Sequence, residues 1–140
     1  MKRTILAGLT MCLTLAIAGT ASAQTTRFEG HWKNVDAHTR GLVELEIKVH
    51  GVDVDVKAWG ACEPHPCDVG NTEAHLFAPN VGDNLEATAR ALTVRYRESF
   101  AERLLVIEPR GPNELAAQLY THFTDGSHRT NYIETAVFKK

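Results

Sequence analysis

Two cysteines and a histidine lie close together in a segment rich in proline and glycine. Cys62, His65 and Cys67 could offer two thiolates and an imidazole to a metal ion, with Glu63 and His75 nearby. In an oxidising compartment the two cysteines would instead form a disulfide, and an oxidised pair has no thiolates for a metal. The C-x4-C spacing also differs from the C-x-x-C of redox motifs. We therefore favour a Cys62–Cys67 disulfide and expect neither a metal site nor a cofactor.

The rest of the chain shows no recognisable set of catalytic residues. There is no G-x-S-x-G, and Ser99 and Ser127 fall in expected turns without a recognisable base. Arg95, Arg97 and Arg103 could receive an anion from neighbouring strands, but nearby glutamates favour a solvated, charge-balanced face. We expect no catalytic residues and a protein that is not an enzyme.

The N-terminus predicts export. Lys2 and Arg3 precede an apolar stretch, and Ala21-Ser22-Ala23 is a small-residue cleavage signal. We expect a secretory signal peptide over residues 1–23 and a single mature domain over residues 24–140. The mature protein should lie in the periplasm of a bacterium or be secreted.

Charge limits the partners of the mature protein. Loss of Lys2 and Arg3 would take the formal net charge from −2 to −4. Such a mild acidic balance argues against nucleic acid or an anionic membrane as the main partner. No second hydrophobic span follows the signal, so we expect no membrane span in the mature chain.

Apolar and polar residues alternate with the period of a strand, most clearly in the hairpin of residues 42–49 and 52–59. A turn at His50-Gly51 would pair apolar residues on one face: Val49 with Val52, Ile47 with Val54, Leu45 with Val56, and Val43 with Ala58. It would also set Glu46 opposite Asp55 and leave Trp59 on the polar face, opposite Leu42. One apolar and one polar face indicate an antiparallel sheet over a core.

Short strands with tight turns continue along the chain. The other expected strands are 27–35, 72–79, 91–98, 101–108, 115–124 and 130–139, with 80–87 as a loop. We predict an all-β fold, a small antiparallel up-and-down barrel of about eight strands, with a β-sandwich as the alternative. The register beyond residue 90 stays open. A three-residue loop at Glu98-Ser99-Phe100 would align Val94 with Leu104 and Leu92 with Val106.

Several motifs carry a family resemblance. Gly30-x-Trp32 is similar to the G-x-W signature of lipocalins and other calycins, and Gly30-x-Trp32-x-Asn34 resembles the opening strand of avidins. A longer pattern, G-x-W-x-N-x-D, T-x-G-L and W-G-x-C-x-P-x-x-C-D-x-G, resembles an uncharacterised family of short exported bacterial barrels. Its residues here are Gly30, Trp32, Asn34, Asp36, Thr39, Gly41, Leu42, Trp59, Gly60, Cys62, Pro64, Cys67, Asp68 and Gly70. The resemblance implies a calycin-type barrel and brings no activity with it.

Two functions remain open. The first is an exported, non-catalytic barrel that holds a small apolar or amphipathic ligand inside or at its mouth. Its candidate ligand-binding residues are Trp32, Asn34, Leu45, Ile47, Val54, Val56, Trp59, Tyr96, Tyr120 and Tyr132. The alternative is a protein-interaction module that uses the disulfide-clipped 60–70 loop and adjacent aromatic residues. A hollow interior would favour the ligand, and a filled interior the protein partner.

Overall fold

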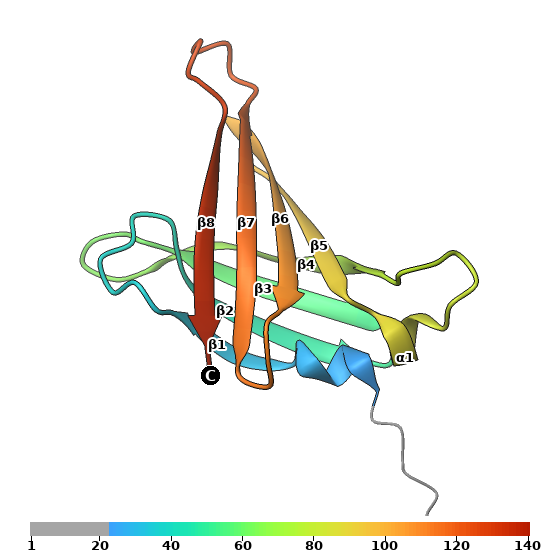
Figure 1. Cartoon of the computed structure of the whole chain (residues 1–140). Coiled ribbons are helices and arrows are strands. Elements are labelled where there is room, and N and C mark those ends of the chain that lie inside the picture. Colours follow the sequence, from blue (N-terminus) through green and yellow to red (C-terminus); the bar gives the residue numbers. More distant parts are fainter. Residues whose placement is uncertain (1–22) are drawn as a thin grey trace, which may run out of the picture.

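The fold of residues 23–140 is described by a computed structural model (Figure 1). These residues form a closed barrel of eight antiparallel strands in chain order, which confirms the predicted up-and-down barrel over the sandwich. The apolar stretch and most of the cleavage signal lie in residues 1–22, outside the described part. The signal peptide and its cleavage after Ala23 therefore stay predictions.

Eight strands and two short helices make up the described chain. The strands β1–β8 span Gly30–Asn34, Leu42–His50, Asp53–Gly60, Cys67–Phe77, Ala91–Arg97, Ala101–Pro109, Glu114–Phe123 and Tyr132–Lys139. The 3-10 helix η1 (Gln24–Arg27) and the helix α1 (Leu85–Thr88) contact each other. The expected 80–87 loop thus contains most of a helix, because the Asn84 side chain caps α1 by accepting a hydrogen bond from the Ala87 N–H at 2.9 Å.

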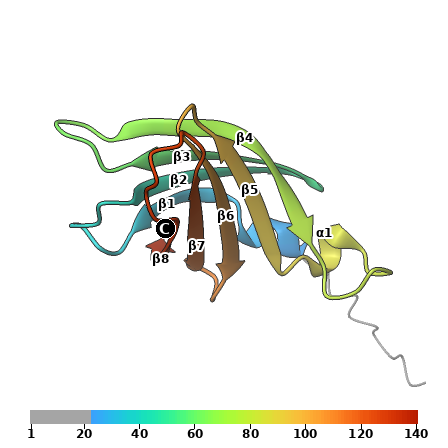
Figure 2. The ribbon, with the colours of Figure 1, turned by 90° about the horizontal axis from the view of Figure 1, so that it is seen from above.

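The two halves of the barrel run in different directions. In Figure 1, β5–β8 rise toward the β7–β8 loop while β2–β4 run across behind them, and Figure 2 shows the same crossing from above. Because the strands alternate in direction, the loops after β1, β3, β5 and β7 share one end of the barrel, here called the loop end. The other end carries η1 and α1 and is called the base. At the loop end, the 35–41 and 61–66 loops meet where the Ala61 N–H donates to the Gly41 carbonyl at 2.8 Å.

Side chains fill the barrel interior. The largest fully buried ones are Trp32, Phe28, Phe138, Leu45, Ile47, Leu92, Leu105, Ile107, Leu115, Val54, Val56 and Val94. Walls of a hollow barrel would keep accessible area toward the lumen, whereas these side chains have at most 1% exposed. A cavity beside Leu105 and Phe138 measures only about 20 Å³, room for about one water. The interior is therefore a packed core.

Trp32 anchors that core near the base. Its indole Nε1–H donates to the Phe28 carbonyl at 2.8 Å, so the buried polar atom is satisfied. The Lys140 ammonium lies 4.6 Å from the Trp32 ring centroid. Gly30 has a φ of 132°, and a Cβ there would lie 2.7 Å from the Lys140 side chain, so this approach needs glycine.

The β2–β3 hairpin has a different register from the predicted one. His50 pairs with Asp53, and the turn is Gly51-Val52, with Gly51 at a φ of 67°. The apolar face now pairs Val49 with Val54, Ile47 with Val56, and Leu45 with Ala58. The shift keeps residues 44–49 and 53–58 on their predicted faces, and it sets Glu46 opposite Lys57 instead of Asp55. The prediction was wrong at Leu42 and Val43, because Leu42 is the buried member of the pair. Trp59 lies opposite Glu44 rather than Leu42 through the same two-residue shift, and the irregular pairing between Leu42 and Glu44 then sets Leu42 opposite Gly60.

The β5–β6 register, which the sequence left open, differs by one residue from the alignment that a three-residue loop would give. Glu98 donates its N–H to the Ala101 carbonyl at 2.9 Å, which leaves a tight turn at Ser99-Phe100 instead of a three-residue loop. Val94 therefore pairs with Leu105, and Leu92 with Ile107. A slip of one residue exchanges the two faces of a strand, so Leu105 and Ile107 are buried instead of Leu104 and Val106.

Candidate functional site

The predicted inward row packs together without leaving a cavity. Leu45, Ile47, Val54 and Val56 are at most 1% exposed, and Trp32 is fully buried beside them. The structure thus assembles five of the candidate ligand-binding residues in one place. Their side chains belong to one packed core cluster, so they form core rather than a pocket.

Asn34 ends β1 and binds backbone instead of a ligand. Its amide nitrogen donates to the Leu42 carbonyl at 2.8 Å, and its amide oxygen accepts from the Asp36 N–H at 2.9 Å. The Asp36 carboxylate in turn accepts from the His38 N–H at 2.9 Å. These side-chain bonds replace strand pairing and turn the chain away from the sheet after Val35.

Trp59 is half-buried on the outer surface, on the face that its parity predicts. The His31 ring stacks on it with centroids 6.0 Å apart, and the Lys57 ammonium lies 4.9 Å from its ring centroid. Glu44 lies 3.0 Å from the His31 ring nitrogen, and Asp68 lies 3.3 Å from Lys57. We call these five residues the Trp59 face. This face presents the Trp59 ring beside two side-chain pairs, His31 with Glu44 and Lys57 with Asp68.

The cysteine loop adjoins this face, since Trp59 pairs with Asp68 one residue after the clip. The predicted disulfide between Cys62 and Cys67 is confirmed, with the two Cα atoms 5.5 Å apart. Residues 61–68 are all exposed, so the clip stabilises a projecting loop and not the core. A cavity of about 590 Å³ separates this loop from the 35–41 loop, with His38, Arg40 and Glu63 among its walls. Within residues 23–140, no three metal-binding side chains gather at one point.

The three tyrosines of the chain occupy different environments. Tyr96 is 4% exposed and donates its hydroxyl to the Val56 carbonyl at 3.2 Å. Burial raises the pKa of the Tyr96 phenol far above its usual range, and the Asp68 carboxylate adds to the shift. Tyr120 and Tyr132 are 43% and 44% exposed, so only these two tyrosines are available to a partner.

Tyr120 and Tyr132 line a groove of about 450 Å³ on the outer surface of β5–β8, called the outer groove. Across its floor, Arg95 pairs with Leu104, Leu104 with Tyr120, and Tyr120 with Ile133. Ile133 is 51% exposed. The groove therefore combines an apolar row with a cation at one end. Among the described residues, Arg95 has no carboxylate within ion-pair distance.

Leu104 and Ile133 were not predicted as parts of a surface. Leu104 faces outward because it pairs with Arg95 on the outer face of β5. Ile133 has the parity of an outward residue in β8, so an apolar side chain on a polar-face position was the available signal. The arginine cluster that could bind an anion is not assembled, because Arg97 pairs with Glu102 at 3.4 Å and Arg103 with Glu98 at 3.1 Å.

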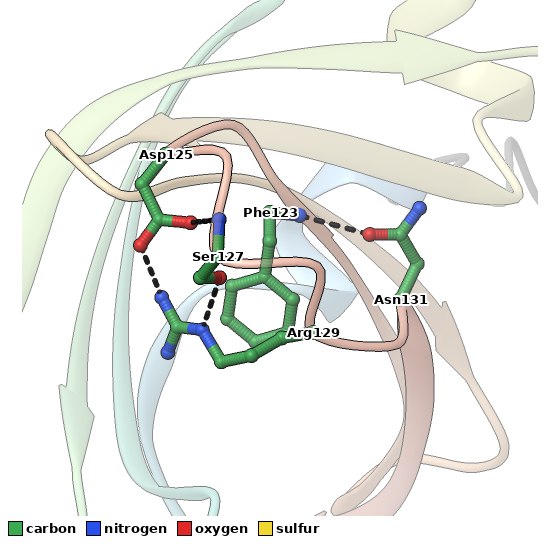
Figure 3. A network of polar contacts seen from close by, with 5 residues as sticks. All are labelled: Phe123, Asp125, Ser127, Arg129 and Asn131. Atoms are coloured by element: carbon green, nitrogen blue, oxygen red, sulfur yellow. Dashed lines mark hydrogen bonds and ion pairs between the residues drawn. The ribbon is translucent and has the colours of Figure 1, made fainter.

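The β7–β8 loop is held together by its own side chains (Figure 3). The Arg129 guanidinium donates to the Asp125 carboxylate at 2.6 Å and to the Ser127 hydroxyl at 2.8 Å, and it lies 3.9 Å from the Phe123 ring centroid. Hydrogen bonds from Ser127 and the Arg129 charge lower the pKa of Asp125 to about 2. The Asn131 side chain accepts from the Phe123 N–H at 2.9 Å. The loop is thus an ordered projection.

Comparison with known proteins adds no assignment. No protein-family model matches the chain, and searches of the curated proteins and of the solved structures found no match. Between residues 23 and 140, no helix is long and apolar enough to cross a membrane.

Proposed function

We propose that the protein is an exported protein-interaction module whose contact surface is the Trp59 face together with the clipped 61–66 loop. The observation that carries the proposal is the packed interior, which leaves the outer surface as the place for recognition. The Cys62–Cys67 disulfide supports export, because such bonds persist in oxidising compartments.

The chemistry of the Trp59 face suits a protein partner. Half-buried tryptophans dominate binding energy in many interfaces, because they bury a large area and lose little conformational entropy. The His31 ring stacks on Trp59, and the Lys57 ammonium lies over the same indole. The clipped loop stands next to it with its backbone path constrained, so little ordering is needed on binding.

Site-specific photocrosslinking in the periplasm tests this proposal. A photoreactive phenylalanine at His65, on the loop tip, should give a discrete adduct with a partner protein. The matched control is Val52, an exposed residue at the opposite end of β3. Trp59→Ala should abolish the His65 adduct without lowering the amount of exported protein. Equal adducts at both positions, or a His65 adduct that is indifferent to Trp59→Ala, would contradict the proposal.

A second candidate function rests on the outer groove. Its volume of about 450 Å³ lies within the range of small-molecule sites, and Leu104, Tyr120 and Ile133 provide apolar area. With Arg95 at its end, the groove suits an amphipathic anion, so we retain a small amphipathic ligand as the alternative.

Dodecanoate is a suitable probe of that alternative. It should raise the melting temperature of the wild-type protein by mass action, and Ile133→Lys or Arg95→Ala should remove the shift. Trp59→Ala should leave the shift unchanged. An absent shift, or one that persists in both groove variants, would exclude this function.

A further inference from the structure

We propose that the edge of β8 over residues 132–136 receives an extended polypeptide segment, which adds to the sheet as a further strand. This site is separate from the Trp59 face, so the photocrosslinking result does not decide it.

The barrel closes over only part of β8. In the β1–β8 ladder, Lys33 pairs with Lys139 and Asn34 with Phe138, and the Val35 N–H donates to the Val137 carbonyl at 2.9 Å. A straight continuation of β1 would place residues 37 and 39 opposite residues 135 and 133. The chain instead turns at Asn34 and Asp36, whose side chains accept the N–H groups of Asp36 and His38. The ladder therefore stops at Val137.

The alternation of a strand identifies which groups face the gap. Since the Val137 carbonyl points toward β1, the N–H and C=O of Thr135 and Ile133 point the same way. The Lys140 N–H, of opposite parity, points the other way, toward the Asn113 carbonyl at 3.4 Å. Within residues 23–140, Thr135 and Ile133 have no hydrogen-bond partner on the β1 side. They form a short open edge, although β7 pairs with β8 along its whole length.

There is space along this edge. A groove of about 360 Å³ lies between the turning chain, with Val35, Asp36 and Thr39, and the edge, with Thr135 and Val137. The side chain of Ile133 points outward, beside Tyr120 of the outer groove. An added strand would thus meet backbone groups along its length and an apolar side chain on its outer side.

The unpaired backbone groups of Thr135 and Ile133 indicate what kind of ligand the edge would bind. Each of these two residues offers one N–H and one C=O, and the two residues are spaced as in a strand. An extended peptide carries the complementary C=O and N–H groups at the same spacing. The added strand would continue the established β1–β8 ladder in line with β1. A second copy is less suitable, because antiparallel β8–β8 pairing centred on Glu134 sets two glutamates opposite each other. We therefore assign the site to a segment of another protein, with an apolar side chain next to Ile133.

Selection of peptides from a phage-displayed library of random linear heptapeptides on the full protein tests the proposal. The affinity of the best synthetic peptide is then measured for two variants at one position. Thr135→Pro removes the N–H that faces the gap but spares the β7–β8 ladder, a position where strands tolerate proline. Thr135→Ala keeps that N–H and is the matched control.

We expect Thr135→Ala to bind like the wild type and Thr135→Pro to lose about ten-fold in affinity or more, since a peptide carbonyl is left unpaired. As a measurement that needs no variant, the peptide should slow the amide exchange of Ile133 and Thr135 in the wild-type protein. No selected peptide, or unchanged exchange at both amides, would overturn the proposal. A wild-type dimer that Thr135→Pro dissociates would also overturn it, in favour of a second copy.

Discussion

The base and the loop end of the barrel are stabilised by different physics. Near the base, Trp32 and Phe28 are fully buried and Lys140 covers the indole. At the loop end, the stabilising contacts are a disulfide, ion pairs and the Arg129–Phe123 stack, most of them exposed. Because the base and core supply burial energy, the loop end can present exposed aromatic side chains without loss of the fold. The loop end and the outer surface therefore carry the exposed aromatic side chains, while the interior carries most of the burial.

Replacing each tryptophan by alanine gives the largest expected effect on stability. It compares the interior with the outer surface through a single residue type. Trp32→Ala should lower the free energy of unfolding by about 3–5 kcal/mol, through a cavity in a packed core. Trp59→Ala removes a half-buried side chain and should cost about 1 kcal/mol. Urea denaturation measures both. Equal losses would show that the outer surface shares the stabilising role.

Removal of the disulfide should have a smaller effect. The double variant Cys62→Ser, Cys67→Ser should lose at most about 2 kcal/mol, because the closed ring is short and constrains little of the unfolded chain. Amide exchange should accelerate in residues 61–68 and stay unchanged at Leu105 in the core. Faster exchange throughout the barrel would mean that the clip supports the fold itself.

Much of the fold could be predicted because its signal is local. The period of two identified the strands, and the parity of residues 45–49 and 53–58 assigned the correct side chains to the core despite a wrong turn position. Turn geometry was the weak point. At Gly51 the error moved the register by two residues and left the faces of residues 44–49 and 53–58 unchanged, whereas at Ser99-Phe100 a turn shorter by one residue exchanges the faces of β6, so its register had to stay open.

The surfaces were less predictable. The Cys62–Cys67 pair and the outward face of Trp59 follow from spacing and parity, and both are confirmed. The contacts of Arg129 and the open edge at Thr135 depend on where β1 leaves the sheet. That point is decided by side-chain bonds from Asn34 and Asp36, which strand periodicity does not report.

Acid titration of the β7–β8 loop has the smallest expected effect on the whole molecule. The pKa of Asp125 is lowered to about 2 from 3.8, so its bonds to Ser127 and Arg129 stabilise the loop above about pH 4. That contribution is lost as the pH falls from about 4 to about 2. The Ser127 amide resonance should follow this titration, and Asp125→Asn should remove it. A midpoint near 4 would show that the loop is not held by these bonds.

The unfolding free energy of Val54→Trp tests the packed interior most directly. Val54 is 1% exposed among the inward residues. In a filled barrel, the larger side chain should overpack the core and cost about 1–3 kcal/mol, and urea denaturation should show the loss. If Val54→Trp is as stable as the wild-type protein, the barrel has room for a tryptophan. That result would contradict the packed interior and return the inward row to the role of a ligand site.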